Sequence, residues 1–327
     1  MPVKAIRIHE DGAPDVLRYE DAPDPVPGTG QVLIELRAAS LNHLDVWVRK
    51  GLPSVPKPRI LGADGAGIIV SGDGFTRGDR VVINPALEHG GGRITVVGEH
   101  MDGTHAERIA LPREQVYPIP DGLDFETAAA FPLVFETAYR MLVTKAHLRE
   151  GEWVFVWGIG SGVSTACLAI AKELGAHVVT TSSSADKLER ARELGADAAL
   201  DHDADDVVAV VKELTGGGAH VVVDHVGEAT WQRSLAAARA DGRVCVCGAT
   251  SGPNPPAQLH RIWWKQLTVY GSTMGTPTDF EAVYELVSSG RVVPVIDHVF
   301  SLRDAAKAHE RLEAGEQLGK IVLRIPD

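Results

Sequence analysis

The chain has 327 residues, 44% hydrophobic and 23% charged, which is typical of a soluble globular protein with room for two domains. The formal net charge of −12 argues against a nucleic-acid or membrane-surface partner, because such partners need clustered Lys and Arg. No apolar run approaches the length of a membrane span, and the chain starts directly with a strand pattern, so we expect a cytoplasmic protein. We expect the three cysteines to be buried free thiols.

Short strand patterns interrupted by Pro and Gly fill the first third of the chain. They are expected at residues 4–9, 31–39, 67–71, 80–84 and 106–111. This succession of short strands predicts a small β-rich domain. Three consecutive glycines make residues 88–93 the best candidate for a mobile surface loop.

Helices and strands alternate from about Phe125 onward. After a helical pattern over 125–145, we expect strands at 153–157, 177–181, 198–200, 220–224, 242–247 and 267–271, and helices at 163–174, 185–194, 204–214, 229–238 and 279–289. Such alternation predicts an α/β fold with right-handed crossovers and a doubly wound parallel sheet, whose ligands lie at the carboxyl ends of the strands. From Val293 the pattern returns to strand, helix, strand. We therefore predict one domain from residues 1–124 and 293–327, and a second from 125–292.

The most informative segment runs from Trp153 to Ser182 and has the pattern strand, glycine turn, helix, strand. A helix N-terminus behind a glycine turn offers free N–H groups to a pyrophosphate. The predicted contacts are Gly160, Ser161, Gly162 and Val163. The pattern G-x-G-x-x-G is met only approximately, because Ser164 follows the glycines where a last glycine would normally lie, and a glycine turn of this kind can also be purely structural.

The end of the second strand in this segment bears on the choice of cofactor. An NAD site usually has an acid there, whereas this chain has hydroxyls followed by Lys187. Ser182, Ser183 and Lys187 can bind a 2′-phosphate through charge-assisted hydrogen bonds, which favours NADPH. The serines can equally cap the helix that begins near Ala185, and the two roles are compatible.

Several short motifs carry a resemblance to a known family. They are residues 31–45, Leu61-Gly-Ala-Asp-Gly-Ala-Gly-Ile68, Gly78-Asp-Arg-Val81 and Gly319-Lys-Ile-Val322. With the order of domains described above, they resemble the medium-chain dehydrogenase/reductase superfamily over essentially the whole chain. The resemblance implies a GroES-like domain completed by the C-terminal residues, and a Rossmann domain that binds the cofactor.

The residues that hold the catalytic zinc in alcohol dehydrogenases of this superfamily are replaced. The cysteine of C-x-x-D is Asn42, the histidine of G-H-E is Ala63, and the proton-relaying hydroxyl is Leu44. Zinc prefers Cys and His ligands, so we predict that the chain binds no metal and resembles the zinc-free quinone oxidoreductase and enoyl reductase branch.

A separate metal site from Glu88, His89, His100 and His105 is the weaker interpretation. These residues lie in expected loops and lack the i, i+4 spacing that places ligands on one face of a helix.

The resemblance also implies where the remaining site residues lie. Asn42 is the candidate near the nicotinamide, with turn stabilisation as its structural alternative. His43 would approach the pyrophosphate, and Thr137 and Tyr139 would contact the ribose or line the cleft, although Tyr139 can also be core packing. The residues expected to flank the nicotinamide are Gly248, Ser272, Thr273 and Met274. Asn42 and Tyr139 are the catalytic candidates.

These observations favour a zinc-independent, NADPH-dependent oxidoreductase that transfers hydride to quinones or activated C=C bonds of small molecules. Conjugate reduction needs less help from a Lewis acid than alcohol oxidation does, because hydrogen bonds can hold the developing enolate charge. The alternatives are a zinc-type alcohol dehydrogenase and a non-catalytic NADPH-binding protein. The apolar strand near residues 266–272 would form an exposed sheet edge, and by the resemblance we expect it to pair in a homodimer.

Overall fold

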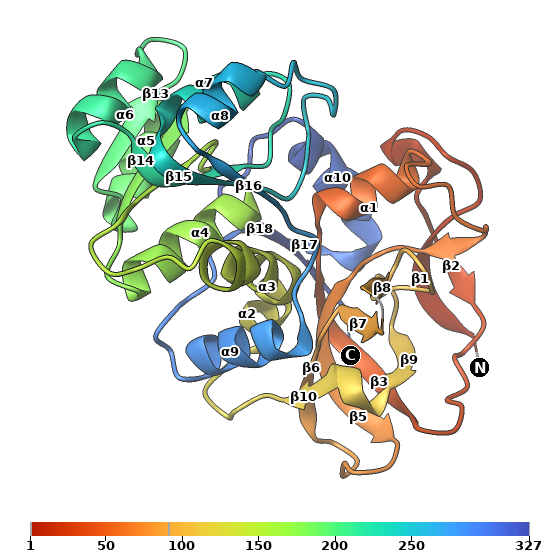
Figure 1. The fold of residues 1–327 in the computed structure, drawn as a ribbon. Coiled ribbons are helices and arrows are strands. Elements are labelled where there is room, and N and C mark those ends of the chain that lie inside the picture. Colours follow the sequence, from red (N-terminus) through yellow and green to blue (C-terminus); the bar gives the residue numbers. More distant parts are fainter. Residues whose placement is uncertain (1, 91, 327) are drawn as a thin grey trace. The chain divides into compact units, whose positions relative to one another are not determined.

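The computed structural model describes residues 2–90 and 92–326, and it divides into two compact units (Figure 1). Unit 1 comprises residues 1–133 and 276–327, and unit 2 comprises residues 134–275. The predicted domains instead change at 124/125 and 292/293. The difference concerns two helices, α2 (Phe125–Ala130) and α9 (Pro277–Ser288), which belong to unit 1. Helix α2 packs on strands β3 and β5, and the α9 residue Phe280 stacks on Phe131 and Tyr117.

Unit 1 is built on a mostly antiparallel sheet. Its strands, in spatial order, are β10 (Val116–Pro118), β6 (Arg80–Ile83), β5 (Asp64–Ser71), β3 (Gln31–Ser40), β18 (Lys320–Arg324) and β17 (Ile296–Ser301), and β9 (Arg108–Pro112) also pairs with β3. A second sheet contains β2 (Arg18–Ala22), β1 (Val3–Ile8) and β4 (Arg59–Ile60). The antiparallel pairing of β18 with β3 brings Val322 opposite Ser40. Residues from the two ends of the chain therefore lie side by side.

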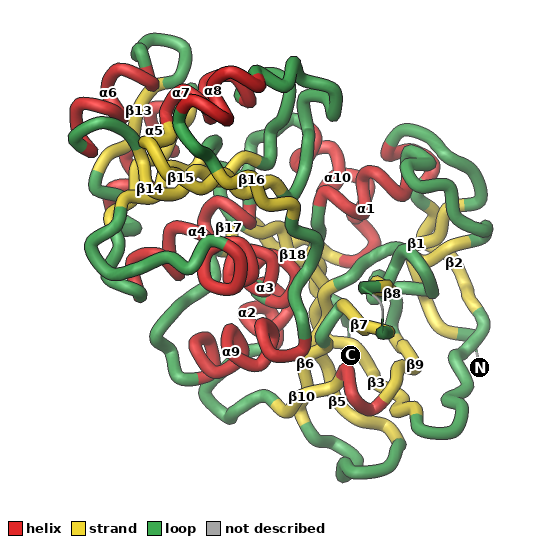
Figure 2. Tube along the Cα trace, viewed as in Figure 1, coloured by secondary structure: helices red, strands yellow, loops and turns green. Residues whose placement is uncertain are grey.

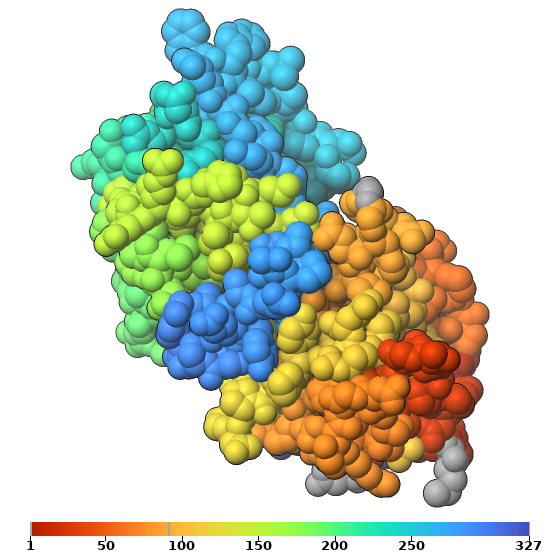
Figure 3. Space-filling view, turned by 60° about the horizontal axis from the view of Figure 1, so that its bottom comes forward, coloured from red at the N-terminus to blue at the C-terminus, as the bar shows by residue number. Residues whose placement is uncertain are grey.

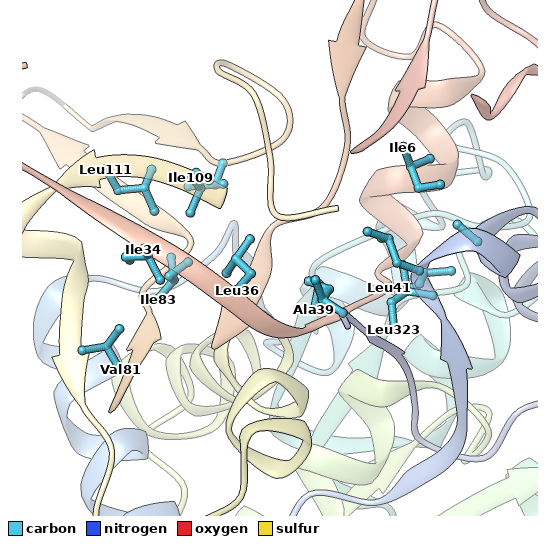
Figure 4. Packing of buried hydrophobic residues seen from close by; sticks show 14 of the residues in the cluster. Ile6, Ile34, Leu36, Ala39, Leu41, Val81, Ile83, Ile109, Leu111 and Leu323 are labelled. Atoms are coloured by element: carbon cyan, nitrogen blue, oxygen red, sulfur yellow. The ribbon is translucent and has the colours of Figure 1, made fainter. Parts of the chain in front are cut away.

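Apolar side chains from several of these strands form the core of unit 1. Figure 4 shows Ile34 and Leu36 of β3 beside Ile109 and Leu111 of β9, all of them buried. Burial of such side chains stabilises a fold by about 1.5–3 kcal/mol each. The core thereby fixes β3, the strand that leads into the helix α1 (His43–Arg49).

The remaining elements of unit 1 include one departure from expectation. Strands β7 (Ala86–His89) and β8 (Arg93–Val96) form an antiparallel hairpin, so the prediction of a mobile loop over residues 88–93 was wrong for Glu88, His89 and Arg93. Gly90 and Gly92 lie in the turn between the two strands. Gly91 lies outside the described residues. Helix α10 (Ala305–Glu313) and the short 3₁₀ segments at 14–16, 113–115 and 302–304 complete the unit.

Unit 2 has the predicted doubly wound sheet. Its six strands are parallel throughout, in the order β13 (Ala198–Asp201), β12 (His177–Ser182), β11 (Trp153–Val156), β14 (Ala219–Asp224), β15 (Ala238–Val246) and β16 (Thr268–Gly271). The helices are α3 (Pro132–Tyr139, starting in the last residues of unit 1), a π-helical segment at Arg140–Lys145, α4 (Gly162–Glu173), α5 (Ala185–Glu193), α6 (Val207–Thr215), α7 (Trp231–Ala237) and α8 (Leu259–Trp264). Figure 2 shows these strands in yellow between red helices.

The fold class predicted from the sequence is confirmed: a β-rich unit accompanies a unit built on a parallel, doubly wound sheet. Helix α8 was not predicted, because it is short and rich in aromatic residues rather than in helix formers. Within the described ranges, no helix combines the length and apolar character that crossing a membrane requires.

Candidate active site

The glycine turn between β11 and α4 forms the base of the candidate cofactor site in unit 2. Ser161 caps α4, since its Oγ accepts the Ser164 N–H at 3.1 Å. Ser164, which replaces the last glycine of the motif, donates its hydroxyl to the Gly158 carbonyl at 2.7 Å. Ser164, in the first turn of α4, therefore links the helix to the beginning of the glycine turn.

The first N–H groups of α4 remain available for a ligand. Within the described part of the chain, the N–H groups of Gly162 and Val163 have no backbone acceptor outside the helix, as expected at a helix N-terminus. Gly160, Ser161, Gly162 and Val163 lie together at this end and are partly exposed. Free N–H groups at a partly exposed helix start suit a pyrophosphate.

His225 belongs to this turn, although the sequence analysis did not single it out. It follows β14, and its Nε2 lies 2.9 Å from the Trp157 carbonyl and 3.4 Å from Ser161 Oγ. Burial lowers the pKa of His225, so the ring is neutral. A neutral ring donates from Nε2 to the carbonyl and holds the turn against β14. Its position directly after a strand of the alternating region was the available signal.

At the end of β12 the predicted capping role is confirmed for Ser184. Ser184 caps α5 by accepting the Lys187 N–H at 3.4 Å, and the buried Ser182 accepts the Ser184 N–H at 3.1 Å. The Ser183 side chain is exposed. Ser182 Oγ keeps its own hydrogen for a further acceptor, and the exposed Ser183 and neighbouring Lys187 add further donors.

The residues after β16 form a third part of the site in unit 2. Arg140 donates to the Thr273 carbonyl at 2.9 Å, and Met274 has a left-handed backbone with φ 52°. Ser272 is buried, and its hydroxyl has no partner among the described residues. Such an unpaired buried hydroxyl calls for a bound group. Gly248 follows the neighbouring β15, and a side chain added there would come into contact with His225.

Thr137 and Tyr139 lie on α3, directly before the π-helical segment that begins with Arg140. Thr137 is buried. π-Helical turns are rare and occur frequently at functional sites. The segment places Arg140 where it bonds Thr273, so Arg140 is a second functional candidate that the sequence analysis missed.

Asn42 lies in a buried polar network in unit 1. Its Oδ1 accepts from Lys320 Nζ at 2.6 Å, and its Nδ2 donates to Asp64 Oδ2 at 2.9 Å. Lys320 Nζ also contacts Asp64 Oδ2 at 2.9 Å, with the two side chains 3% and 0% exposed. Asp64 further accepts from Ser40 Oγ and from the Leu133 N–H.

The neighbouring Asp45 fixes the start of α1 by hydrogen bonds to backbone N–H groups. Its two carboxylate oxygens accept the N–H groups of Asn42 and Gly62 at 2.7 and 2.9 Å. Burial raises the pKa of Asp45 to about 7, against the opposing effect of these donors and of Lys320. His43, at the first position of the helix, is half-buried.

Buried histidines accompany this network. Burial lowers the pKa of His105 to about 4, and neither ring nitrogen has a hydrogen-bond partner among the described residues. Its ring meets that of His309 edge to face, with centroids 6.3 Å apart. His309 Nδ1 lies 3.1 Å from Arg49. The two rings are therefore neutral packing elements at neutral pH.

The residues of unit 1 do not suit zinc. Asn42 Oδ1 is occupied by an ammonium group, which repels a cation, and Ala63 has no ligand atom. In the weaker candidate cluster, His89 bonds Thr95, His100 accepts the Val96 N–H and His105 is buried elsewhere. Across the described residues, no three His, Cys, Asp or Glu side chains are grouped as metal ligands.

The cysteines carry no reactive character. Cys167 and Cys245 are buried and Cys247 is half-buried, and all three are free thiols. Burial raises the pKa of Cys245 and of Cys247 to about 12, so neither forms a thiolate at neutral pH.

Comparison with known proteins agrees with this arrangement. The alcohol dehydrogenase GroES-like domain family matches residues 28–121, and the zinc-binding dehydrogenase family matches residues 162–289. The two matches define an oxidoreductase with a GroES-like and a Rossmann-type part. The chain belongs to the medium-chain dehydrogenase/reductase superfamily.

Individual relatives differ in their activities. A quinone oxidoreductase of Pseudomonas aeruginosa is 33% identical over 98% of this chain and 99% of its own. The crystal structure of an NAD-dependent alcohol dehydrogenase has a TM-score of 0.95 and 40% identity, over 99% of this chain and 100% of that one. A mycobacterial protein solved with NADPH has a TM-score of 0.86 and 29% identity, over 98% and 99% of the two chains.

Proposed function

We propose that this oxidoreductase uses NADPH, without zinc, to transfer hydride to quinones or to activated C=C bonds of enones and enoyl compounds. The observation that carries the proposal is the Asn42–Asp64–Lys320 network, which holds a buried ammonium where a zinc enzyme of this superfamily needs metal ligands. The quinone oxidoreductase relative and the NADPH-bound neighbour support the same activity.

The chain's own residues provide binding and charge stabilisation in this proposal. Bound NADPH supplies the hydride. The N–H groups at the start of α4 would hold its pyrophosphate, His225 fixes the glycine turn, and Ser182, Ser183 and Lys187 would hold the 2′-phosphate. Asn42 would donate a hydrogen bond to the substrate carbonyl and stabilise negative charge on its oxygen, and solvent would supply the final proton.

A substrate panel tests the proposal. Quinones, enones, enoyl thioesters and simple alcohols are assayed with both cofactors. Reduction of a quinone or an activated alkene supports the proposal. Oxidation of alcohols alone supports the alcohol dehydrogenase alternative. The similarity to the NAD-dependent alcohol dehydrogenase structure is the observation that favours this alternative. Binding of NADPH without turnover of any substrate supports a non-catalytic role.

The serines and lysine at the end of β12 predict a preference for NADPH over NADH of at least about tenfold in kcat/KM, on the order of 1.4 kcal/mol. Lys187→Ala is expected to weaken NADPH binding and leave NADH binding unchanged. Ser182→Asp should shift the preference toward NADH, because a carboxylate repels the 2′-phosphate. Equal kcat/KM for the two cofactors in the unmodified protein would contradict the prediction.

Removal of metal is expected to leave the activity intact. Because Asn42 and Ala63 cannot bind zinc, the purified protein should contain less than stoichiometric zinc and should reduce its substrates at the same rate after chelation. Elemental analysis and assays with and without EDTA measure both quantities. Stoichiometric zinc that leaves together with the activity would overturn the proposal.

A homodimer is expected to cover the open edge of the sheet in unit 2. Among the described residues, strand β16 pairs only with β15, and its Val269 is 41% exposed. Trp263 and Trp264 of the preceding α8 are 65% and 83% exposed. Figure 3 shows light-blue side chains of this part of the chain standing out from the surface. An apolar strand edge is covered in most native proteins. Sedimentation at micromolar concentration should show a dimer, and a monomer would rule it out.

A further inference from the structure

The Asn42 side chain lies between two opposite charges. Lys320 Nζ is 2.6 Å from Asn42 Oδ1, and Asp64 Oδ2 is 2.9 Å from Asn42 Nδ2. The lysine and the aspartate also contact each other at 2.9 Å. The three groups therefore form a closed triangle, and Asn42, Asp64 and Lys320 are all buried.

This triangle allows only one orientation of the amide. In the reversed orientation, the NH₂ group would face the ammonium, which has no acceptor, and the carbonyl would face the carboxylate, which has no donor. Both contacts would be repulsive. The side-chain charges thus determine which end of the amide is oxygen and which is nitrogen, a choice that distances alone do not make.

The amide keeps one N–H group after these bonds are made. Nδ2 has two hydrogens, and in the described part of the chain its one hydrogen-bond partner is Asp64. Oδ1 is engaged by a full positive charge. Towards a ligand, the amide is consequently a donor and not an acceptor.

The elements around the triangle hold it rigidly. Asp64 is at the first position of β5 and is anchored by Ser40 Oγ and by the Leu133 N–H. Lys320 is at the first position of β18, whose register with β3 is set by the pair Val322 and Ser40. Groups on paired strands are placed more accurately than groups on loops.

We propose that Lys320 is a positioning residue that fixes the Asn42 amide as a hydrogen-bond donor and thereby selects substrates that present a carbonyl oxygen. The inference deepens the proposed function and rests on it. A quinone, enone or enoyl thioester carbonyl accepts the remaining N–H and is then satisfied. An alcohol oxygen can accept it too, but the amide offers no acceptor for the alcohol's own O–H, because Oδ1 is engaged by Lys320. Lys320 itself acts only through Asn42.

A double-mutant cycle tests the coupling between the two residues. The four proteins are the unmodified chain, Asn42→Ala, Lys320→Met and the double variant, assayed with NADPH and the best quinone of the panel. Asn42→Ala and Lys320→Met should each lower kcat/KM by about 100-fold. In the Lys320→Met background, Asn42→Ala should cost less than about threefold, because an amide free to turn has already lost its function. Additive effects would overturn the inference.

Control variants separate positioning from a general loss of structure. Lys4→Met removes another ion-paired lysine of unit 1, one that is exposed, and should leave kcat/KM unchanged. Lys320→Arg keeps the charge, so its kcat/KM should be at least about tenfold higher than that of Lys320→Met. The Kd for NADPH should change less than about twofold in every variant. If Lys320→Arg is as impaired as Lys320→Met, charge is not what positions the amide.

A measurement without substrate distinguishes failure of this inference from failure of the proposed function. In the ¹⁵N-labelled protein, the two side-chain N–H signals of Asn42, assigned from the Asn42→Ala spectrum, should exchange slowly with solvent, and the signal of the hydrogen bonded to Asp64 should lie downfield of a free amide. In Lys320→Met both signals should move toward the positions of a free asparagine amide and exchange faster. The same signals in both proteins would overturn the inference, whatever the enzyme reduces. Altered signals together with no reduction of any carbonyl substrate would overturn the proposed function and, with it, the substrate selection.

Discussion

Replacement of Asp64 by alanine is expected to destabilise unit 1 by about 3–5 kcal/mol, because it leaves the buried ammonium of Lys320 without its counter-charge. The change also removes the acceptor for Ser40 and for the Leu133 N–H. A loss of this size should lower the thermal midpoint by on the order of 10 °C in a unit of this length. Thermal unfolding followed by circular dichroism, with limited proteolysis to identify the unit that opens, measures the effect.

Two control variants test whether the loss of stability in Asp64→Ala comes from the buried ion pair. Asp73→Ala removes an exposed carboxylate of the same unit and should change stability by less than about 0.5 kcal/mol. The double variant of Asp64→Ala with Lys320→Met removes both charges and should be more stable than Asp64→Ala alone, since no unpaired charge stays buried. If Asp64→Ala unfolds at the same temperature as Asp73→Ala, the ion pair does not stabilise unit 1.

Replacement of Asn42 by alanine should lower kcat about 100-fold, roughly 2.7 kcal/mol of transition-state stabilisation, because a preorganised donor to the developing enolate oxygen is lost. Steady-state kinetics with a quinone or enone and NADPH check the value. The neighbouring Leu44→Thr is the control, and it should neither lower this rate nor create alcohol oxidation, since a hydroxyl relay without zinc has no alkoxide to serve. Full kcat combined with a lower melting temperature in Asn42→Ala would show that Asn42 is purely structural.

Sequence alone predicted most of unit 2, for a physical reason. Each βα repeat there is a local pattern, in which an apolar strand, a turn and an amphipathic helix follow one another within about 30 residues. The glycine turn, the missing acid after β12 and the serine caps could all be recognised without tertiary information.

The site in unit 1 was less predictable, because its contacts join residues far apart in the chain. Asn42 and Lys320 are separated by 278 positions, and the sequence analysis gave Lys320 only a place in a short motif. That analysis placed Asn42 near the nicotinamide without identifying the partners of its amide group. The structure shows that one N–H and the oxygen are already engaged. His225 and Arg140 were missed for the same reason, since their partners Trp157 and Thr273 are distant in sequence.

The pairing of β18 with β3 also has a consequence for biosynthesis. Asp64 is translated early, whereas Lys320 leaves the ribosome only after all of unit 2 has been made. Until then the carboxylate of Asp64 lacks the ammonium group of Lys320, and β3 lacks its neighbour β18. A contiguous unit folds readily during synthesis, so unit 2 should acquire its structure first. The nascent GroES-like part should remain sensitive to protease until the last strand arrives, which makes it the part of the newborn chain most in need of a chaperone.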